Sequence, residues 1–511
     1  MEMRPFFSAI FSLAVLASPS LAVAQRIAPA LIPQPQSLVA HSCGKSFDFG
    51  RPLRVNAAVD EGALSLLNER WHSLGIPRAV RSSAPDITIS LHGSSAQSYR
   101  LVVDGPRVSI EAGDADGAFY AMMTLAQLPQ NVNGAWVLPC VAISDRPALP
   151  WRVLSDDISR GPLPSMRYFK ERIRTIAAFK MNGYSPYMEH VFADPRNPLP
   201  APLDGITPAE LHELSIYAKR FHVAFIPEQQ TFAHMHNTLR WEEYAPAAEL
   251  PHGYLLSPAN PLSLRYQKEL IADELAAVPH PPFFHIGSDE PSDLGRGQTK
   301  TLVDTQGDAA VYAAHITQMA DLVAPSGARI MVWDDAIQGK PDILNHIPKS
   351  TVIINWHYGA EKTYAPYIKT IASHGFDQMI APGALNWNEI WPDLAAAIPN
   401  EQHFIAQGKD GKVLGLFQTV WHDDGESLYE ATWYPVLFAA GSAWETRDVA
   451  PDRFAQDFPS AFFGSDDQRY GQDIVALSDA VHRLKAQGDS THYLFWGDPL
   501  DGRIARRVQQ S

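Results

Sequence analysis

The spacing of apolar positions changes near residue 150 and divides the chain into two parts. In the first part, apolar and polar residues alternate over 98–103 and 107–111, on either side of Asp104-Gly105-Pro106. A period of two around a turn sequence predicts a β-hairpin, and residues 118–128 have the pattern of a helix. We therefore expect a small α+β accessory domain over residues 25–148.

In the second part, short apolar runs alternate with helical patterns. Eight of these runs are candidate strands: Arg152–Asp157, Gly183–Tyr187, Val223–Pro227, Phe283–Gly287, Arg329–Trp333, Thr351–Trp356, Phe376–Pro382 and Val413–Val420. Between the second and third runs, Thr207-Pro208-Ala209-Glu210 has the sequence of a capped helix start. Eight strand–helix units over about 300 residues predict a (β/α)8 TIM barrel at residues 149–447.

A doubly wound open sheet is the alternative α/β fold for this pattern. That fold carries a glycine-rich phosphate loop after its first strand, and no such loop follows Asp157. Residues 448–511 have helical patterns, so we expect them to form a helical C-terminal extension.

Residues 1–24 have the layout of a secretory signal peptide. Arg4 precedes the apolar run 6–17, and Ala22-Val23-Ala24 is a small-x-small cleavage site. The apolar run is too short for a membrane-spanning helix, and no later stretch is long and apolar enough to be one. We expect cleavage after residue 24 and export to the periplasm or the medium.

Composition narrows the class of partner. The formal net charge is −15, and the sequence has no run of lysine or arginine. Both observations argue against a surface that binds nucleic acid. Cys43 and Cys140 are the two cysteines, and in an exported protein they could form a disulfide. Their spacing suggests neither a metal site nor a thiol nucleophile.

In a TIM barrel, the residues that follow the strands face a single mouth. These positions carry Arg152 with Asp156-Asp157, Glu189-His190, Glu228 with His234, Asp289-Glu290, Trp333-Asp334-Asp335, Trp356 with Tyr358, Asn386-Trp387, and Trp421-His422-Asp423. Tryptophan rings suit the apolar faces of a pyranose, and carboxylates and arginine suit its hydroxyls. With no cofactor fingerprint present, this inventory is typical of a carbohydrate-processing pocket, although any of the tryptophans could instead be core packing.

One segment carries a specific resemblance. His285-Ile286-Gly287-Ser288-Asp289-Glu290 resembles the His-x-Gly-Gly-Asp-Glu signature of family 20 glycoside hydrolases, the β-N-acetylhexosaminidases. Further similar segments occur in the family's order, namely Ile32-Pro33-Gln34-Pro35-Gln36, Pro150-Trp151-Arg152, Asp157-Ile158-Ser159-Arg160 and Lys180-Met181-Asn182. Gln230-Thr231-Phe232-Ala233-His234 resembles the variant found in the hexosaminidase D-like branch.

Three positions depart from the family pattern. Ser288 replaces the second glycine of the signature, and Gln230 stands where many members carry an aspartate. Glu189 either replaces another aspartate of the family or is a carboxylate on a surface loop.

The resemblance implies a mechanism that suits two adjacent carboxylates. A retaining glycosidase with its own nucleophile needs two carboxylates about 5–5.5 Å apart on opposite sides of the bond, and neighbours at one strand end rarely achieve that. In substrate-assisted hydrolysis, the acetamido oxygen of the sugar attacks C1 instead. Glu290 is then the general acid, and Asp289 holds the acetamido N–H and stabilises the oxazolinium intermediate. The Asp289 charge and apolar walls are expected to favour protonated Glu290.

The resemblance also implies binding roles. Arg152 matches the arginine that grips sugar hydroxyls, and the alternative, suggested by its place at the start of a strand, is a salt bridge at the bottom of the barrel. His234 is expected near the acid, and Asp423 stands where the family carries a glutamate that binds hydroxyls. Tyr358 is the candidate for the tyrosine that donates to the acetamido oxygen. Trp333, Trp356, Trp387 and Trp421 are the candidate walls.

The predicted function is an exo-acting β-N-acetylhexosaminidase that removes terminal β-linked GlcNAc or GalNAc with retention, without a cofactor or metal. A metal-dependent barrel hydrolase is one rival, suggested by the aspartate pairs 156–157, 334–335 and 423–424 and by His234-Met235-His236, which lack a recognised ligand spacing. A non-catalytic glycan-binding barrel is the other, and the presence of both Asp289 and Glu290 argues against it.

Overall fold

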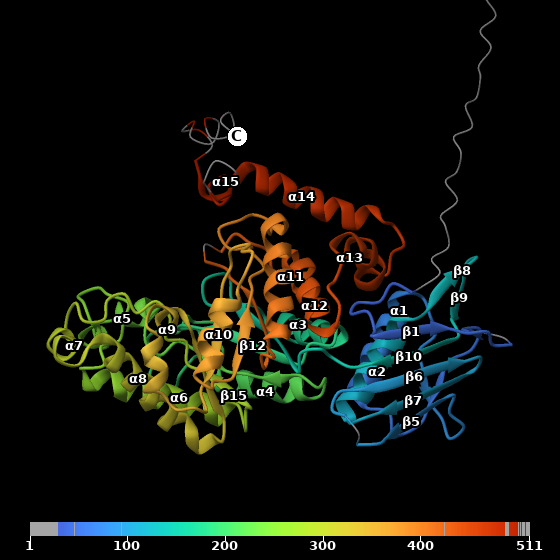
Figure 1. Ribbon diagram of the computed structural model, residues 1–511, viewed down its shortest axis with the longest axis horizontal. Helices are drawn as coiled ribbons and strands as arrows, with labels where there is room; N and C mark the ends of the chain where they lie inside the picture. The colour runs from blue at the N-terminus through green and yellow to red at the C-terminus, as the bar shows by residue number, and fades with distance from the viewer. Residues whose placement is uncertain are drawn as a thin grey trace, which may run out of the picture.

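The computed structural model describes residues 29–498 except 45, 94, 424 and 486–489, together with Leu500, Gly502 and Arg506. The predicted signal peptide lies outside the described residues. A mixed sheet with two helices comes first, a parallel barrel follows, and the last helices lie beyond the barrel (Figure 1).

The N-terminal part is built on a seven-stranded sheet. Its strand order is β1 (Ser37–Ala40), β10 (Val141–Asp145), β6 (Tyr99–Asp104), β7 (Arg107–Ala112), β5 (Ile87–Leu91), β3 (Arg54–Val55) and β4 (Val80–Arg81). The predicted hairpin is β6–β7, and it pairs Asp104 with Arg107 across the turn. Helix α2 (Ala115–Gln127) packs on this sheet and against α1 (Glu61–Ser73), so the predicted α+β architecture is confirmed.

A smaller three-stranded sheet of β2 (Phe47–Asp48), β9 (Ala135–Leu138) and β8 (Gln130–Val132) lies beside it. Cys43 and Cys140 form a disulfide between the chain preceding β2 and the chain following β9.

The barrel strands match the eight predicted runs. They are β11 (Trp151–Asp157), β12 (Gly183–Met188), β13 (Ala224–Phe225) with β14 (Glu228–Gln229), β15 (Phe283–His285), β16 (Arg329–Trp333), β17 (Val352–Trp356), β18 (Gln378–Ala381) and β19 (Gly415–Val420). The predicted run Val223–Pro227 contains only β13, and the strand resumes beyond that run as β14. The break falls at Ile226-Pro227, where proline has no N–H to donate to a ladder. Parallel pairing of β11 with both β12 and β19 closes the barrel, which confirms the (β/α)8 fold.

The longer barrel helices are α3 (Met166–Ala178), α4 (Pro208–Lys219), α6 (Pro261–Ala277), α8 (Asp308–Val323), α10 (Ala365–Ser373), α11 (Leu394–Asp410) and α12 (Trp433–Trp444). The capped start predicted at Thr207 is present in α4. The Thr207 hydroxyl accepts the Glu210 N–H at 3.2 Å, and the Glu210 carboxylate accepts the Thr207 N–H at 3.0 Å. Such a cap stabilises a helix by about 1 kcal/mol.

The C-terminal extension is helical, as expected. It contains α13 (Pro451–Phe458), the π-helical turn Pro459–Phe463, α14 (Arg469–Lys485) and α15 (Tyr493–Trp496). Thr491, just before α15, donates through its hydroxyl to Glu389 at 2.6 Å and accepts the Ile390 N–H at 3.0 Å. The extension therefore braces the loop after β18.

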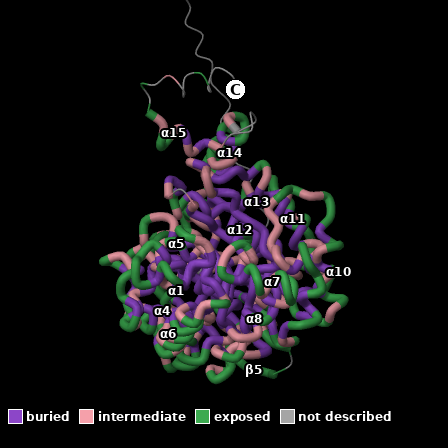
Figure 2. The backbone as a smooth tube through the Cα atoms, turned by 90° about the vertical axis from the view of Figure 1, so that its left-hand side faces the viewer, coloured by how far each residue is buried: buried purple, intermediate pink, exposed green. Residues whose placement is uncertain are grey.

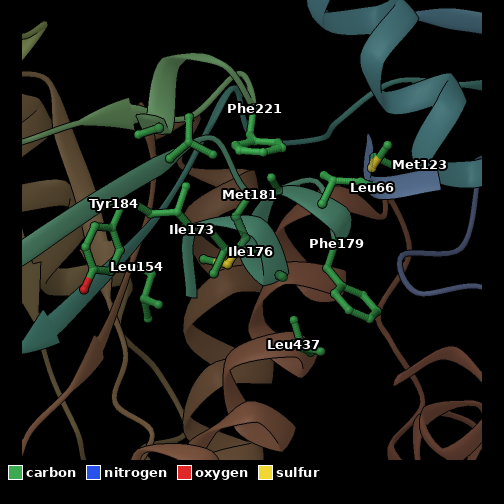
Figure 3. Packing of buried hydrophobic residues seen from close by; sticks show 14 of the residues in the cluster. Leu66, Met123, Leu154, Ile173, Ile176, Phe179, Met181, Tyr184, Phe221 and Leu437 are labelled. Atoms are coloured by element: carbon green, nitrogen blue, oxygen red, sulfur yellow. The ribbon is translucent and has the colours of Figure 1, made fainter. Parts of the chain in front are cut away.

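The accessory part and the barrel share one apolar core. Leu66, Met123, Phe179, Met181 and Leu437 belong to a single buried cluster that joins α1, α2, the start of β12 and α12 (Figure 3). Buried residues fill the centre of the molecule, and exposed residues lie on the outer helices (Figure 2). Within the described ranges, no helix has both the length and the apolar character that a membrane crossing requires.

Candidate active site

A pocket of about 200 Å³ opens at the carboxyl ends of the barrel strands. Its lining residues are Arg160, Tyr187, His234, Asp289, Glu290, Trp333, Trp356, Tyr358, Trp387, Trp421 and Asp423. Nine of the ten predicted site residues are in this set, and Arg152 is not. The strand ends therefore do converge on one mouth.

The two carboxylates meet at a single imidazole. His234 Nε2 lies 3.2 Å from Asp289 Oδ2 and 3.4 Å from Glu290 Oε2. Burial alone would lower the pKa of His234, but the Asp289 charge and the close contacts with both carboxylates raise that pKa to about 11. His234 is therefore an imidazolium at neutral pH, placed between the two acids.

Asp289 is the more enclosed of the two acids. Burial by itself would raise the pKa of Asp289, but the His234 charge and the hydrogen bonds from His234 and Gln230 hold it below its usual value. The side chain of Glu290, by contrast, is 56% exposed. The apolar enclosure expected around Glu290 is thus not present, because this residue projects from the turn toward the open side of the pocket.

The turn that carries the acids has unusual backbone angles. Gly287, Ser288 and Glu290 have φ values of 65°, 71° and 48°, all in the left-handed region. A Cβ at Gly287 would lie 2.1 Å from Gln230 Oε1, so any larger residue would force the Gln230 side chain to move. Ser288 tolerates the same conformation because its N–H donates to Gln230 Oε1 at 3.2 Å and its carbonyl accepts the Tyr312 hydroxyl at 2.7 Å.

His285, the first residue of the predicted signature, lies behind the pocket. Burial lowers the pKa of His285 to about 3, so the ring is neutral. Its Nδ1 accepts the Gly287 N–H at 3.0 Å, and the ring lies 4.6 Å from that of Trp333. His285 therefore orders the turn and the wall and does not enter the pocket.

Aromatic rings form most of the pocket wall. The centroids of Trp333 and Trp421 are 5.7 Å apart, and Tyr358 lies 5.1 Å from Trp356 and 4.9 Å from Trp387. The Trp421 indole N–H donates to the Tyr358 hydroxyl at 2.8 Å and fixes its orientation. Such rings present rigid apolar faces with a few polar atoms at their edges.

Arg152 is wrongly predicted as a pocket residue. It is the second residue of β11, at the end of the barrel opposite the mouth, and it is fully buried. Its guanidinium donates to the carbonyls of Lys180 and Leu149, each at 2.7 Å, and to Gln97 Oε1 at 2.9 Å. Arg152 therefore joins the accessory part to the bottom of the barrel.

Arg160 is the arginine of the pocket. It lies three residues after the last residue of β11, and its guanidinium contacts Asp157 and Asp423, each at 2.8 Å. The same group lies 5.1 Å from the ring centroid of Tyr187 and 4.9 Å from that of Trp421. The signal was present in the segment Asp157-Ile158-Ser159-Arg160, since positions past the strand end are those that face the mouth.

Tyr187 is the second pocket residue that the sequence analysis missed. Its hydroxyl donates to Glu189 Oε1 at 3.0 Å and accepts from Gln230 Nε2 at 3.2 Å. Glu189 is buried, which rules out the surface-loop interpretation, and burial with the nearby Asp157 charge raises its pKa to about 7 against the pull of Arg160. Glu228, another candidate from the strand ends, is buried below the pocket and hydrogen-bonds to Ser155 and Ser185.

The aspartate pairs behind the metal hypothesis do not gather. Asp156 pairs with Arg172, Asp157 with Arg160, and Asp334 accepts the Trp356 N–H at 3.0 Å, while Asp424 lies outside the described residues. Over the described part of the chain, the one group with the spacing of a metal site is His234, Asp289 and Glu290.

Comparisons with known proteins agree with this fold. The sequence model described as glycosyl hydrolase family 20, catalytic domain, matches residues 201–444, and the one for domain 2 of that family matches residues 28–146. The beta-hexosaminidase of Vibrio furnissii is 23% identical over 419 residues, which are 72% of this chain and 65% of that protein. The chain thus spans just under two thirds of that relative's length.

A solved structure shows the same fold. The family 20 exo β-N-acetylglucosaminidase from Vibrio harveyi, whose structure was determined with N-acetylglucosamine, has a TM-score of 0.70 at 18% identity. The match covers 88% of this chain and 78% of that chain.

Hexosaminidase D of Bos taurus is 25% identical over 212 residues, which are 40% of this chain and 61% of that protein. The chain belongs to glycosyl hydrolase family 20, and its place in the hexosaminidase D-like branch remains a prediction.

Proposed function

We propose that this protein is an exo-acting β-N-acetylhexosaminidase that hydrolyses terminal β-linked GlcNAc or GalNAc from glycans with retention. One observation carries the proposal: Asp289 and Glu290 contact the same His234 nitrogen at one end of an aromatic-walled pocket. Family membership and the hexosaminidase relatives support it.

The geometry of the acids supports substrate assistance. Oxygens of Asp289 and Glu290 lie within 4.8 Å of each other and of His234 on one side of the pocket. Two carboxylates that flank a glycosidic bond stand about 5–5.5 Å apart with the sugar between them. With both acids on one side, the attacking oxygen comes from the acetamido group of the sugar.

The proposed steps give each acid one role. Glu290 gives its proton to the glycosidic oxygen as the C1–O bond breaks, and the acetamido oxygen forms a bond to C1. Ionised Asp289 accepts the acetamido N–H and faces the positive charge of the oxazolinium ring. Glu290 then removes a proton from the water that opens the ring, and the original configuration at C1 is restored.

The walls of the pocket supply binding. Trp333, Trp356, Trp387 and Trp421 offer faces for the ring and the N-acetyl methyl group. Arg160 and Asp423, ion-paired at 2.8 Å, present a donor and an acceptor to the sugar hydroxyls. Tyr358, oriented by the Trp421 indole, is the candidate donor to the acetamido oxygen.

A panel of chromogenic aryl glycosides tests this function. Turnover is expected with the β-N-acetylglucosaminide or the β-N-acetylgalactosaminide and not with the β-glucoside, and Glu290→Gln should abolish most of it. Full activity after treatment with a chelator would exclude the metal-dependent rival. Tight binding of the sugars with no turnover of any glycoside would instead identify a non-catalytic glycan-binding barrel.

Asp289→Asn separates substrate assistance from a conventional double displacement. Its activity on N-acetylated substrates should fall by about 100-fold or more, and a thiazoline mimic of the cyclised intermediate should inhibit the unmodified enzyme strongly. Weak inhibition by the thiazoline would contradict the proposed nucleophile.

We also propose export to the periplasm or the medium. The pattern of residues 1–24 supports it, as does the disulfide between Cys43 and Cys140, since such bonds persist in oxidising compartments. N-terminal sequencing of the expressed protein should find Gln25 as the first residue of the exported form. An uncleaved protein retained in the cytosol would contradict export.

A further inference from the structure

The backbone of Glu290, the general acid proposed above, has a conformation that contacts from other residues must stabilise. Glu290 has a φ of 48°, a backbone conformation that residues other than glycine, asparagine and aspartate rarely adopt. Its carboxylate contacts His234 at 3.4 Å and is otherwise largely exposed. The direction of the proton-donating group therefore depends mainly on how the main chain of Glu290 is held.

Two side chains from other loops hold that main chain. The Glu290 N–H donates to Asp335 Oδ2 at 2.8 Å, and the Glu290 carbonyl accepts the Tyr254 hydroxyl at 2.8 Å. Asp335 is the first residue of α9 (Asp335–Gly339), directly after β16, and Tyr254 lies in the loop before α6. Together they hold the N–H and the carbonyl group of Glu290 by hydrogen bonds.

The Asp335 carboxylate lies in unfavourable surroundings. Its Oδ1 is buried without a hydrogen-bond partner, which is costly for a carboxylate. Burial and the charge of Asp289 raise the pKa of Asp335 to about 6. Groups kept in such unfavourable surroundings are concentrated at functional sites.

We propose that Asp335 is a positioning residue for the general acid. By accepting the Glu290 N–H, it holds the left-handed backbone that aims the Glu290 carboxyl at the glycosidic oxygen, and Tyr254 assists from the carbonyl side. This inference rests on the proposed function, in which Glu290 donates the proton. Asp335 is not among the residues that line the active-site pocket, so its role is exerted through Glu290.

The leaving group provides the test. An aryl N-acetylglucosaminide with a strongly acidic phenol needs little protonation to depart, whereas one with a weakly acidic phenol depends on the acid. Asp335→Ala should lower kcat for the poor leaving group by about 30-fold, part of the 10²–10⁴-fold that a general acid contributes. For the good leaving group, kcat should fall by less than about 3-fold, with KM little changed for both.

Two further variants complete the design. Asp335→Asn keeps an acceptor oxygen and should recover most of the lost rate. Tyr254→Phe removes the bond to the Glu290 carbonyl at a half-exposed position and should show the same leaving-group dependence, so the proposal stays testable if Asp335→Ala folds poorly. Asp308→Asn, which removes one charge from an exposed ion pair with Lys340, is the matched control and should leave both rates unchanged.

The outcomes separate the two proposals. The positioning role would be overturned if Asp335→Ala and Tyr254→Phe each lowered kcat equally for both leaving groups. It would also be overturned if neither variant lowered kcat for either leaving group. If the unmodified protein turns over no N-acetylhexosaminide, or if Glu290→Gln lacks the leaving-group dependence, the proposed function itself fails. Leaving-group dependence in Glu290→Gln but not in Asp335→Ala or Tyr254→Phe would refute only the inference about Asp335.

Discussion

The side-chain amide of Gln230 donates a 2.7 Å hydrogen bond to Asp289 Oδ1, and its oxygen accepts the N–H of Ser288. An amide can serve both neighbours at once, whereas a carboxylate at this position could only accept and would repel ionised Asp289. The departure of Gln230 from the aspartate that many family members carry is therefore consistent with an intact site. Here His234 supplies the positive charge that balances Asp289.

Gln230→Glu tests this relationship with almost no change of shape. The new carboxylate would lose the bond to Asp289 and place like charges side by side, so Asp289 would be ionised less readily. We expect kcat/KM on an aryl N-acetylglucosaminide to fall by about 10-fold or more. The measurement is steady-state kinetics near neutral pH, and an unchanged kcat/KM would show that the amide is not needed.

Arg160 and Arg152 form a natural pair for a second prediction. Arg160→Lys keeps the charge but loses the planar group that contacts both Asp157 and Asp423, so kcat/KM should fall by about 10–100-fold with little loss of stability. Arg152→Lys should do the opposite, lowering the free energy of unfolding by about 2 kcal/mol or more while the folded fraction keeps its kinetics.

Urea unfolding and steady-state kinetics of the two variants measure these effects on stability and activity. If Arg152→Lys raised KM for the sugar and Arg160→Lys did not, the assignment of Arg160 to the pocket would be wrong.

These two arginines also show what the sequence could and could not predict. The eight strands were recognisable from apolar runs, and nine site residues followed from their position after those strands. Arg152 was chosen because its motif resembles the family, although its place at the strand's start argued for a structural role. Tyr187 was missed because all positions of β12 are buried, and no alternation marks which side chains face the mouth. Arg160, past the end of β11, was open to prediction from its position after the strand.

The turn of the acids lay beyond sequence reasoning for a different reason. The left-handed backbone at Ser288 and Glu290 is imposed by partners distant in sequence, such as Tyr312 and Asp335. Local propensity gives no sign of it, since neither serine nor glutamate favours that conformation. The division of the third strand at Pro227 was readable in principle, because proline interrupts a ladder.

Gly287 permits a third prediction, with another glycine of positive φ as the control. Gly287 and Gly327 both have positive φ, but a Cβ at Gly327 meets nothing within 4 Å, whereas one at Gly287 would collide with Gln230. Gly327→Ala should cost about 1–2 kcal/mol of stability and leave kcat unchanged. Gly287→Ala should cost more and should also lower kcat by about 10-fold or more, because Gln230 must move away from Asp289.

Thermal unfolding and kinetics of the two alanine variants check this prediction. Equal effects of both substitutions on kcat would mean that contact with Gln230 does not matter.

His234 gives a prediction about pH. Its pKa of about 11 in the folded protein lies above the ordinary value of 6.5, so the folded state binds this proton more tightly than the unfolded state. The stability that His234 contributes is therefore complete below pH 6.5 and declines as the pH rises toward 11. In urea unfolding at several pH values between 6 and 9, the difference in unfolding free energy between the unmodified protein and His234→Gln should shrink with pH. The slope should be at most about 1.4 kcal/mol per pH unit. A difference that stayed constant over this range would show that the imidazole is neutral between Asp289 and Glu290, and the charge balance proposed for the two acids would then be wrong.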